Sequence, residues 1–384
     1  LYTIIDGIFI SRFIGSNALS SLNIVFPIFS ISISIATMLA TGGNAIISKY
    51  MGEGNYKKAR QSLSLFVFIT VIISLTILIL TRTFLVPISR FLGATDILLD
   101  DCISYLGTYI LFISACMLQT LFQSYLVTAG HPAIGLALTV CAGIFNAVLD
   151  YVFIVIFKMG IAGAALATVF SQCVSAFLVT WSLTKDYDSM KLQFRELRME
   201  ACVLKRELKI GIPGALQACA YGVTNVVIQA SINSFGTDTA AGWAAYGKLD
   251  LIFWTVSSAL GAAVTTFVGQ NYGAGKWDRV YKSIRVNIGI SYVFTGMIIF
   301  TLYAFCEPMY HMFTTDPKVI DIGVYMLRFL VPSYLLSILL ENLDGGLRGV
   351  GDVLWPTIFT FGGLFLIRLP WVAFEKNFPF VSCL

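Results

Sequence analysis

Long apolar runs separated by short polar loops dominate the sequence. Eleven of them are predicted to be transmembrane helices, for which about 20 apolar residues are needed. The predicted helices are 1–13, 18–47, 63–80, 104–127, 133–156, 161–183, 210–235, 240–268, 284–305, 319–340 and 354–374. The first is short because we interpret Leu1 as lying inside a helix whose beginning is missing. The mixed segment 82–101 is predicted to be an interfacial connection.

Composition agrees with this pattern. Hydrophobic residues make up 57% of the chain and charged residues 12%, whereas an ordinary soluble domain has about 25% charged residues. We therefore predict an all-α polytopic membrane protein. Its main partner is the lipid bilayer, and the net charge of +4, which lies in loops, gives no reason to expect nucleic-acid binding.

A repeat with an offset of 221 residues relates the two halves of the chain. Four pairs of glycines in predicted turns have this separation: Gly15 and Gly236, Gly52 and Gly273, Gly54 and Gly275, Gly130 and Gly351. We therefore predict a tandem repeat of two six-helix lobes, with the first helix partial and the twelfth missing. The predicted domains are an N-terminal lobe at 1–184, a linker at 185–209 and a C-terminal lobe at 210–384. Parallel lobes around a central cavity are a transporter architecture.

Lysine and arginine residues concentrate on one side of this topology. Most of them lie in the linker and in the loops after the second and eighth predicted helices. Because cytoplasmic loops carry the excess of positive charge, we expect the linker and these loops to be cytoplasmic.

The fifth predicted helix carries Asn146 and Asp150 inside its apolar run. An ionisable group at this depth costs about 3 kcal/mol, so it typically marks a transport pathway or a proton relay. Asp6 lies nine positions before the outer turn at Gly15, and Asp150 and Thr168 lie at similar distances from the next outer turn. At a rise of about 1.5 Å per residue, all three are roughly 13 Å below the same surface.

We therefore predict that Asp6, Asn146, Asp150 and Thr168 converge in the first half. Such an all-oxygen set can bind Na⁺, or it can hold a proton because burial and a like-charged neighbour favour the neutral acid. The alternative is a polar pair that only holds two helices together.

The second half does not repeat this set but has polar and aromatic residues of its own. The candidates for a cavity in the C-terminal lobe are Gln217, Tyr221, Asn225, Lys248, Asp250 and Trp254. Aromatic side chains among them would suit flat organic cations through cation–π contacts. Glu341 and Asp344 are expected near the cytoplasmic end, where a solvated or capping role is favoured. Arg348 and Asp352 flank a turn and are expected to anchor it.

Catalytic and cofactor-binding motifs are missing from the sequence. The eight cysteines are scattered without a C-x-x-C pair or a histidine at ligand spacing, so we predict neither a disulfide framework nor a metal site. There is no P-loop, Gly-x-Ser-x-Gly or His-Glu-x-x-His motif. An intramembrane enzyme is therefore not supported, and transport should be driven by an ion gradient. We expect no cofactor, with Na⁺ only as a coupling ion.

Several segments, taken in order along all 384 residues, resemble the multidrug and toxic compound extrusion (MATE) family of transporters. They are Asp6-Gly-Ile-Phe-Ile-Ser-Arg-Phe-Ile-Gly15, the Gly-x-Gly loops after the second and eighth predicted helices, Gly211-Ile-Pro213, Ala245-Tyr-Gly-Lys248-Leu-Asp250 and Leu347-Arg-Gly-Val-Gly351-Asp352. The resemblance implies twelve helices in two lobes, a cavity alternately open to each side, and efflux driven by H⁺ or Na⁺.

The resemblance also implies roles for residues. It places Asp6, Asn146, Asp150 and Thr168 on the coupling-ion site of the N-terminal lobe. Some members of the family instead use a glutamate on the seventh helix, but the matching stretch, Gln217 to Tyr221, contains no acid. The pattern around Lys248 is similar to the Firmicutes-type branch, so we expect a monomer in a bacterial plasma membrane that exports small organic cations. The alternative function is that of a lipid-linked oligosaccharide flippase, which a strongly basic cavity would favour.

Overall fold

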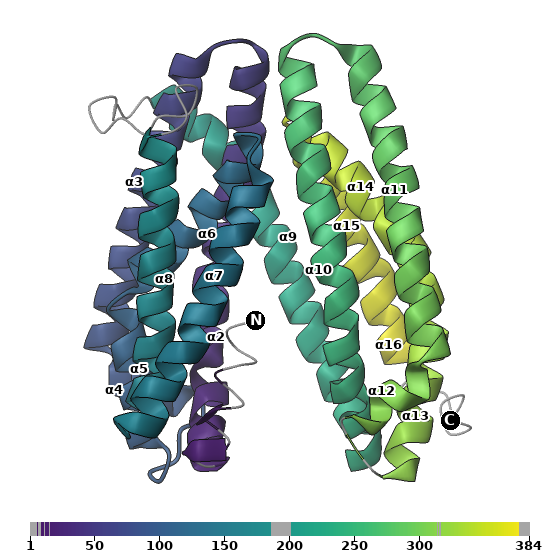
Figure 1. Ribbon diagram of the computed structural model, residues 1–384. Helices are drawn as coiled ribbons and strands as arrows, with labels where there is room; N and C mark the ends of the chain where they lie inside the picture. The colour runs from purple at the N-terminus through teal and green to yellow at the C-terminus, as the bar shows by residue number, and fades with distance from the viewer. Residues whose placement is uncertain are drawn as a thin grey trace. The chain divides into compact units, whose positions relative to one another are not determined.

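The computed structural model describes residues 6, 9–10, 12–14, 16–185, 201–312, 314 and 316–375. Every element within these ranges is helical (Figure 1), which confirms the prediction of an all-α protein. The chain divides into two compact units. Unit 1 comprises Leu1–Ile47 and Asn55–Glu207, and unit 2 comprises Ser48–Gly54 and Leu208–Leu384.

The described helices of unit 1 include two long ones followed by several shorter segments. In chain order they are α2 (Ser16–Gly52), α3 (Tyr56–Thr83), α4 (Leu85–Phe91), α5 (Leu99–Ile110), α6 (Ile113–Thr128), α7 (Pro132–Asp150), the π-helix η1 (Tyr151–Ile156) and α8 (Gly160–Lys185). The last residues of α2 group with unit 2.

Unit 2 follows a similar order. Its helices are α9 (Ala201–Asn233), α10 (Thr237–Gly273), α11 (Trp277–Ala304), α12 (Cys306–His311), α13 (Pro317–Leu330), η3 (Val331–Ser333), α14 (Tyr334–Val350), α15 (Leu354–Phe361), the π-helix η4 (Gly362–Arg368) and α16 (Leu369–Glu375). The first turns of α9 fall inside the predicted linker, of which residues 186–200 lie outside the described part of the chain.

Seven described helices are long and apolar enough to cross a membrane, or eight if the bent pair α5 and α6 forms one span. The predicted count of eleven is therefore not confirmed, although the chain is an integral membrane protein. The predicted helix 104–127 is broken, since α5 and α6 meet at an angle of 53°. At the junction, Phe112 has φ −115° and ψ 15°, which interrupts the regular helix.

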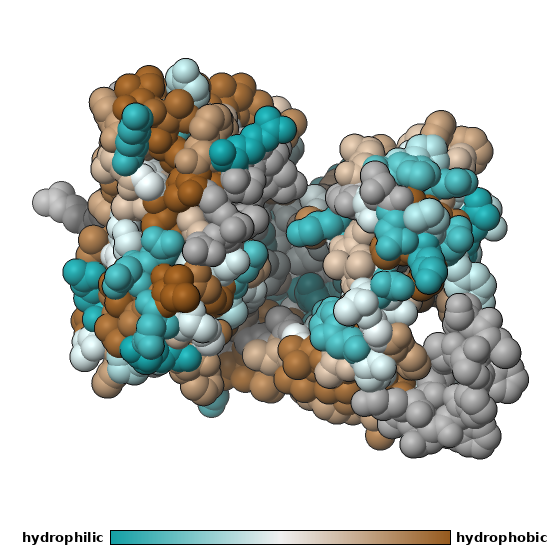
Figure 2. Space-filling model, turned by 90° about the horizontal axis from the view of Figure 1, so that it is seen from below, coloured by the Kyte–Doolittle hydropathy of each residue, from teal (hydrophilic) through white to brown (hydrophobic). Residues whose placement is uncertain are grey.

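Many large apolar side chains are exposed on the helices of both units, as expected for helices that contact lipid. The end of the molecule seen from below, by contrast, mixes hydrophilic and hydrophobic residues (Figure 2). Large exposed examples are Phe177 and Phe300, with 68% and 70% of their surface accessible. In a soluble protein such extended apolar surface would favour aggregation. In a bilayer it lies against acyl chains.

The helix bounds follow the register of the predicted repeat. Adding 221 to both ends of α2 gives the bounds of α10, and adding it to both ends of α3 gives those of α11. The turn glycines agree as well, because Gly54 and Gly275 have φ of +72° and +69°, and Gly130 and Gly351 have φ of +87° and +88°. Glycine adopts this left-handed backbone without steric cost. These correspondences agree with the predicted repeat, which itself stays a prediction.

Close packing of α14 on α10 positions the polar residues of unit 2. A Cβ atom added at Gly345 would lie 2.7 Å from the Gly261 carbonyl oxygen, and one at Gly349 would lie 2.8 Å from that of Thr265. Small residues allow membrane helices to approach in this way. This close approach fixes α14 against α10.

Candidate ion-binding site

Asp6, Asn146 and Thr168 form a hydrogen-bonded cluster inside unit 1. Thr168 Oγ1 donates to Asp6 Oδ2 at 2.6 Å, and Asn146 Nδ2 donates to Asp6 Oδ1 at 3.2 Å. Asn146 Nδ2 also lies 3.5 Å from Thr168 Oγ1. Their exposed fractions are 3%, 0% and 7%. The structure thus brings these three predicted residues together, from the segment before α2, from α7 and from α8.

Asp150 lies one helical turn after Asn146 and is fully buried. Its carboxyl group is close enough to that of Asp6 for the two to interact electrostatically. Neither Asp150 oxygen has a hydrogen-bond partner among the described residues, and the same is true of Asn146 Oδ1. Buried acceptor oxygens without a donor are rare in native proteins because their desolvation is not compensated. Three of them beside a second carboxylate form a site that a proton or a hard cation would satisfy.

The chemistry of this donor set suits Na⁺ as well as H⁺. Carboxylate, carbonyl and hydroxyl oxygens are the ligands that hard cations prefer. A proton on one carboxyl group would equally remove the repulsion between the two acids. Either ion would neutralise a charge that has been removed from water.

The backbone changes its helical form directly after Asp150. The sequence predicts a continuous α-helix over 133–156, but α7 passes into the π-helix η1 at Tyr151. The N–H group of Phe157 accordingly donates to the carbonyl oxygen of Val152, five residues earlier, at 2.9 Å. Such segments are rare and are frequently found at functional sites. Asp150 therefore lies at the boundary between two helical geometries.

Two tyrosines on α5 belong to the surroundings of the site, although the sequence analysis did not select them. Tyr105 is 3% exposed and interacts electrostatically with both Asp6 and Asp150. Tyr109, four residues later, is 5% exposed. The ring of Phe29 packs against both, with centroid distances of 5.5 and 4.1 Å. The spacing of two tyrosines on one helix face was the signal that could have indicated them.

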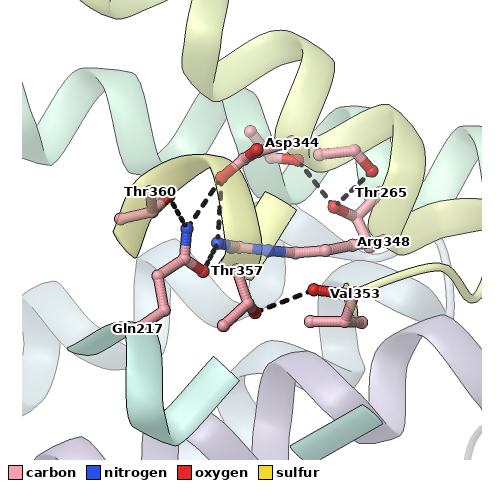
Figure 3. A network of polar contacts seen from close by, with 9 residues as sticks. Gln217, Thr265, Asp344, Arg348, Val353, Thr357 and Thr360 are labelled. Carbon is pink, nitrogen blue, oxygen red and sulfur yellow. Dashed lines mark hydrogen bonds and ion pairs between the residues drawn. The ribbon is translucent and has the colours of Figure 1, made fainter. Parts of the chain in front are cut away.

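In unit 2, the predicted residue Gln217 joins three helices through a separate polar network (Figure 3). Its Nε2 donates to Asp344 Oδ2 at 3.0 Å and to Thr360 Oγ1 at 2.7 Å. Arg348 Nη2 donates to Gln217 Oε1 at 2.8 Å and lies 3.5 Å from Asp344 Oδ2. The network connects α9, α14 and α15. Unlike the site in unit 1, it pairs its carboxylate with a cation.

This network corrects the expectation for two residues. Asp344 is only 7% exposed, so the expected solvated or capping role is wrong. Its side chain contacts Gln217 of α9, which also bonds to Thr360 of α15, and spacing along the sequence does not reveal these neighbours. Arg348 donates to Gln217 in addition to lying near the turn. Asp352 accepts a bond from the Trp355 N–H at 3.5 Å, which ties the turn to the start of α15.

Of the other cavity candidates of unit 2, Tyr221 lies near the Gln217 network, and the rest have other surroundings. Asp250 Oδ1 accepts hydrogen bonds from the hydroxyl groups of Tyr246 and Tyr334 at 3.2 and 2.6 Å. Lys248 and Asn225 are exposed, while Tyr221 and Trp254 are half-buried. Tyr221 interacts electrostatically with Asp344, and Trp254 packs on Phe253. A role for these residues in a substrate cavity stays a prediction.

Replacing Thr168 by valine is expected to destabilise the protein, because the change keeps the shape but removes the donor to Asp6. A hydrogen bond to a charged group contributes about 1.5–3 kcal/mol. Thermal unfolding in detergent would measure the loss. The matched control is Thr180→Val on the same helix, whose hydroxyl bonds, within the described part of the chain, only to the Ala176 carbonyl oxygen. If the two substitutions lowered the thermal stability equally, the hydrogen bond to Asp6 would contribute no more to stability than the bond to a backbone carbonyl.

This chain resembles known transporters both in sequence and in fold. Probable multidrug resistance protein YoeA of Bacillus subtilis (strain 168) is 24% identical over 374 residues, covering 95% of this chain and 80% of that protein. Multidrug export protein MepA of Staphylococcus aureus (strain MSSA476) is 24% identical over 364 residues, covering 93% of this chain and 80% of that protein.

Solved structures agree in fold. The crystal structure of MATE in the bent conformation has a TM-score of 0.90 at 20% identity and covers 99% of this chain and 84% of its own. A MOP superfamily transporter from Pyrococcus furiosus, described as having a binding pocket of reverse polarity that suggests a different function, has a TM-score of 0.91 at 19% identity, covering 98% of this chain and 84% of its own. The MatE family profile matches residues 1–152 and 213–373. The chain therefore belongs to the MatE family.

Proposed function

We propose that this protein is a secondary active transporter that exports small organic cations from a bacterial cell in exchange for H⁺ or Na⁺. The observation that carries the proposal is the buried site of unit 1, where Asp6 and Asp150 interact and three acceptor oxygens have no donor among the described residues. The names of the relatives, a multidrug resistance protein and a multidrug export protein, support the same function.

Ion binding at this site can be coupled to a conformational change. Without an ion, the buried carboxylates repel each other and one of them lacks hydrogen bonds. With an ion, this cost disappears. The two ion-binding states therefore favour different arrangements of the surrounding helices, and a ligand shifts a conformational equilibrium only through such a difference in affinity. The helical geometry changes directly after Asp150, and the proposed movement of the helix would occur at this point.

The proposed substrate contacts lie in the C-terminal lobe. Polar and aromatic side chains of the C-terminal lobe would contact the substrate there, with cation–π contacts for flat organic cations. The proposed residues are Gln217, Tyr221, Asn225, Lys248, Asp250 and Trp254. The driving force is the ion gradient, so we propose no catalytic step and no cofactor.

The second candidate is a flippase for lipid-linked oligosaccharides. The fold itself does not distinguish the two functions, since a transporter with a pocket of reversed polarity has the same fold. The acidic site in unit 1 favours the exchange of cations. An anionic lipid-linked substrate would instead favour an excess of cationic side chains.

Efflux of ethidium from proteoliposomes containing the purified protein tests the proposal. An H⁺ gradient and a Na⁺ gradient are imposed in separate experiments, with protein-free liposomes as the control. We expect dye movement against its gradient with one of the two ions, which identifies the coupling ion. If neither gradient moved ethidium or several other organic cations, the result would contradict the proposal and favour the flippase.

A further inference from the structure

The start of α11 carries an unusual concentration of unpaired positive charge. Four cationic side chains lie there within ten residues, and all are exposed: Lys276, Arg279, Lys282 and Arg285. None of them forms an ion pair with another described residue. The nearby acid Asp278 is exposed as well, so the local charge is strongly positive.

This charge lies at the base of the lipid-facing side of the helix. Residues seven apart share nearly the same face of an α-helix, because seven residues make almost two turns. Arg279 is aligned in this way with Val286, Val293 and Phe300, whose exposed fractions are 52%, 62% and 70%. The buried residues of α11 are Val280, Ser291, Thr295 and Leu302, which project from the opposite side. One face of α11 therefore begins with a cation and continues as exposed apolar surface.

Aromatic side chains lie at the same level of α11, on the other side of the helix from Arg279. Trp277 and Tyr281 are 50% and 58% exposed, and their ring centroids are 6.4 Å apart. Tryptophan and tyrosine are enriched where the acyl region of a bilayer meets the head groups. Their position places the cations at head-group depth.

Repeat-related α3 lacks this arrangement, which separates the cluster from a general excess of positive charge in loops. With the offset of 221, Arg279 corresponds to Lys58, but Lys282 and Arg285 correspond to Gln61 and Ser64. The five consecutive residues 62–66 of α3 are all buried. The same region of α11 has exposed side chains at 285 and 286. Both helices expose their first turn, including Lys57 and Lys58 of α3, but of the two only α11 stays exposed at the positions that follow, 285 and 286.

We propose that the start of α11 is a binding site for an anionic phospholipid. Arg279 and Lys282 would donate to the phosphate oxygens of the head group, since arginine and lysine are the usual partners of phosphate. The exposed face from Val286 onward contacts an acyl chain. This site is separate from the proposed ion site and does not depend on it.

Native mass spectrometry of the full protein, released from nanodiscs of phosphatidylglycerol and phosphatidylcholine with matched acyl chains, tests the proposal. We expect the protein to retain phosphatidylglycerol preferentially. The double variant Arg279→Gln/Lys282→Gln should lower this retention about tenfold, since each cation near an anionic membrane surface contributes appreciably to lipid binding. The double variant Lys57→Gln/Lys58→Gln removes the same charge from the start of α3 and should retain phosphatidylglycerol as the parent does.

Three results would overturn the proposal. The first is an equal loss of phosphatidylglycerol in both double variants, which would show a non-specific charge effect. The second is the absence of any preference in the unmodified protein, which tests the site without a substitution. The third is displacement of the lipid by glycerol phosphate at similar concentration, which would indicate a site for free phosphate. Circular dichroism and gel filtration verify that the variants are folded.

Discussion

Asp150→Asn is expected to reduce gradient-driven efflux to the level of protein-free liposomes while expression and folding are preserved. The asparagine side chain has nearly the same shape but can neither be protonated nor neutralise a cation. The Asp150 oxygens accept no hydrogen bond from a donor among the described residues, and the asparagine amide could still donate to Asp6. An ionised group in an apolar span costs several kcal/mol, so its removal should leave thermal stability unchanged or raise it. Loss of coupling without loss of stability is the expected signature.

Efflux of ethidium and thermal unfolding, measured on the same preparation, check this prediction. The control is Asp96→Asn, which removes a carboxylate from an exposed pair with Arg90 in the same unit. It should leave efflux unchanged. Undiminished efflux in Asp150→Asn would refute the role assigned to Asp150. A large loss of stability would instead indicate that Asp150 holds the helices together.

Arg348→Gln is expected to destabilise unit 2 by about 3 kcal/mol, the lower end of the range for removing one partner from a buried ion pair. Asp344 has a side chain that is only 10% exposed. Without the arginine, its charge would keep only the donor Gln217. We use the lower end of this energy range because the Arg348 side chain is 27% exposed. The second substitution Asp344→Asn should recover much of the lost stability.

Chemical or thermal unfolding of the single and double variants measures this coupling. Arg90→Gln serves as the control, because it breaks an exposed pair whose side chains are 55% and 85% accessible. Such surface pairs contribute about 0–1 kcal/mol. If Arg348→Gln were no more destabilising than Arg90→Gln, the network around Gln217 would not hold α9, α14 and α15 together.

The sequence predicted the depth of polar residues better than their direction. A constant rise along a helix placed Asp6, Asn146 and Thr168 at one level, and the structure joins them by hydrogen bonds. The direction in which a side chain points depends on how neighbouring helices are rotated. For this reason the sequence did not reveal that Asp344 lies beside Gln217, or that Tyr105 lies near the carboxylates.

Local departures from ideal helices were also beyond prediction. The π-helix after Asp150 and the bend between α5 and α6 arise within apolar runs that contain neither proline nor a polar break at those points. Hydrophobicity alone gives the same pattern for an α-helix and a π-helix. By contrast, Gly54 and Gly130 were correctly predicted as turns, because a glycine followed by a polar or proline-containing segment is a strong signal for a turn.

The most direct test of the proposed coupling site is a count of ions displaced by substrate. Ethidium binding is measured by calorimetry in buffers of different ionisation enthalpy, which reports H⁺, and in parallel with ²²Na⁺. We expect the unmodified protein to release about one H⁺ or Na⁺ per bound cation, since two ligands that favour opposite states displace each other. Asp150→Asn should bind ethidium without release. Equal release by both proteins, or none by the unmodified protein, would contradict ion coupling at Asp6 and Asp150.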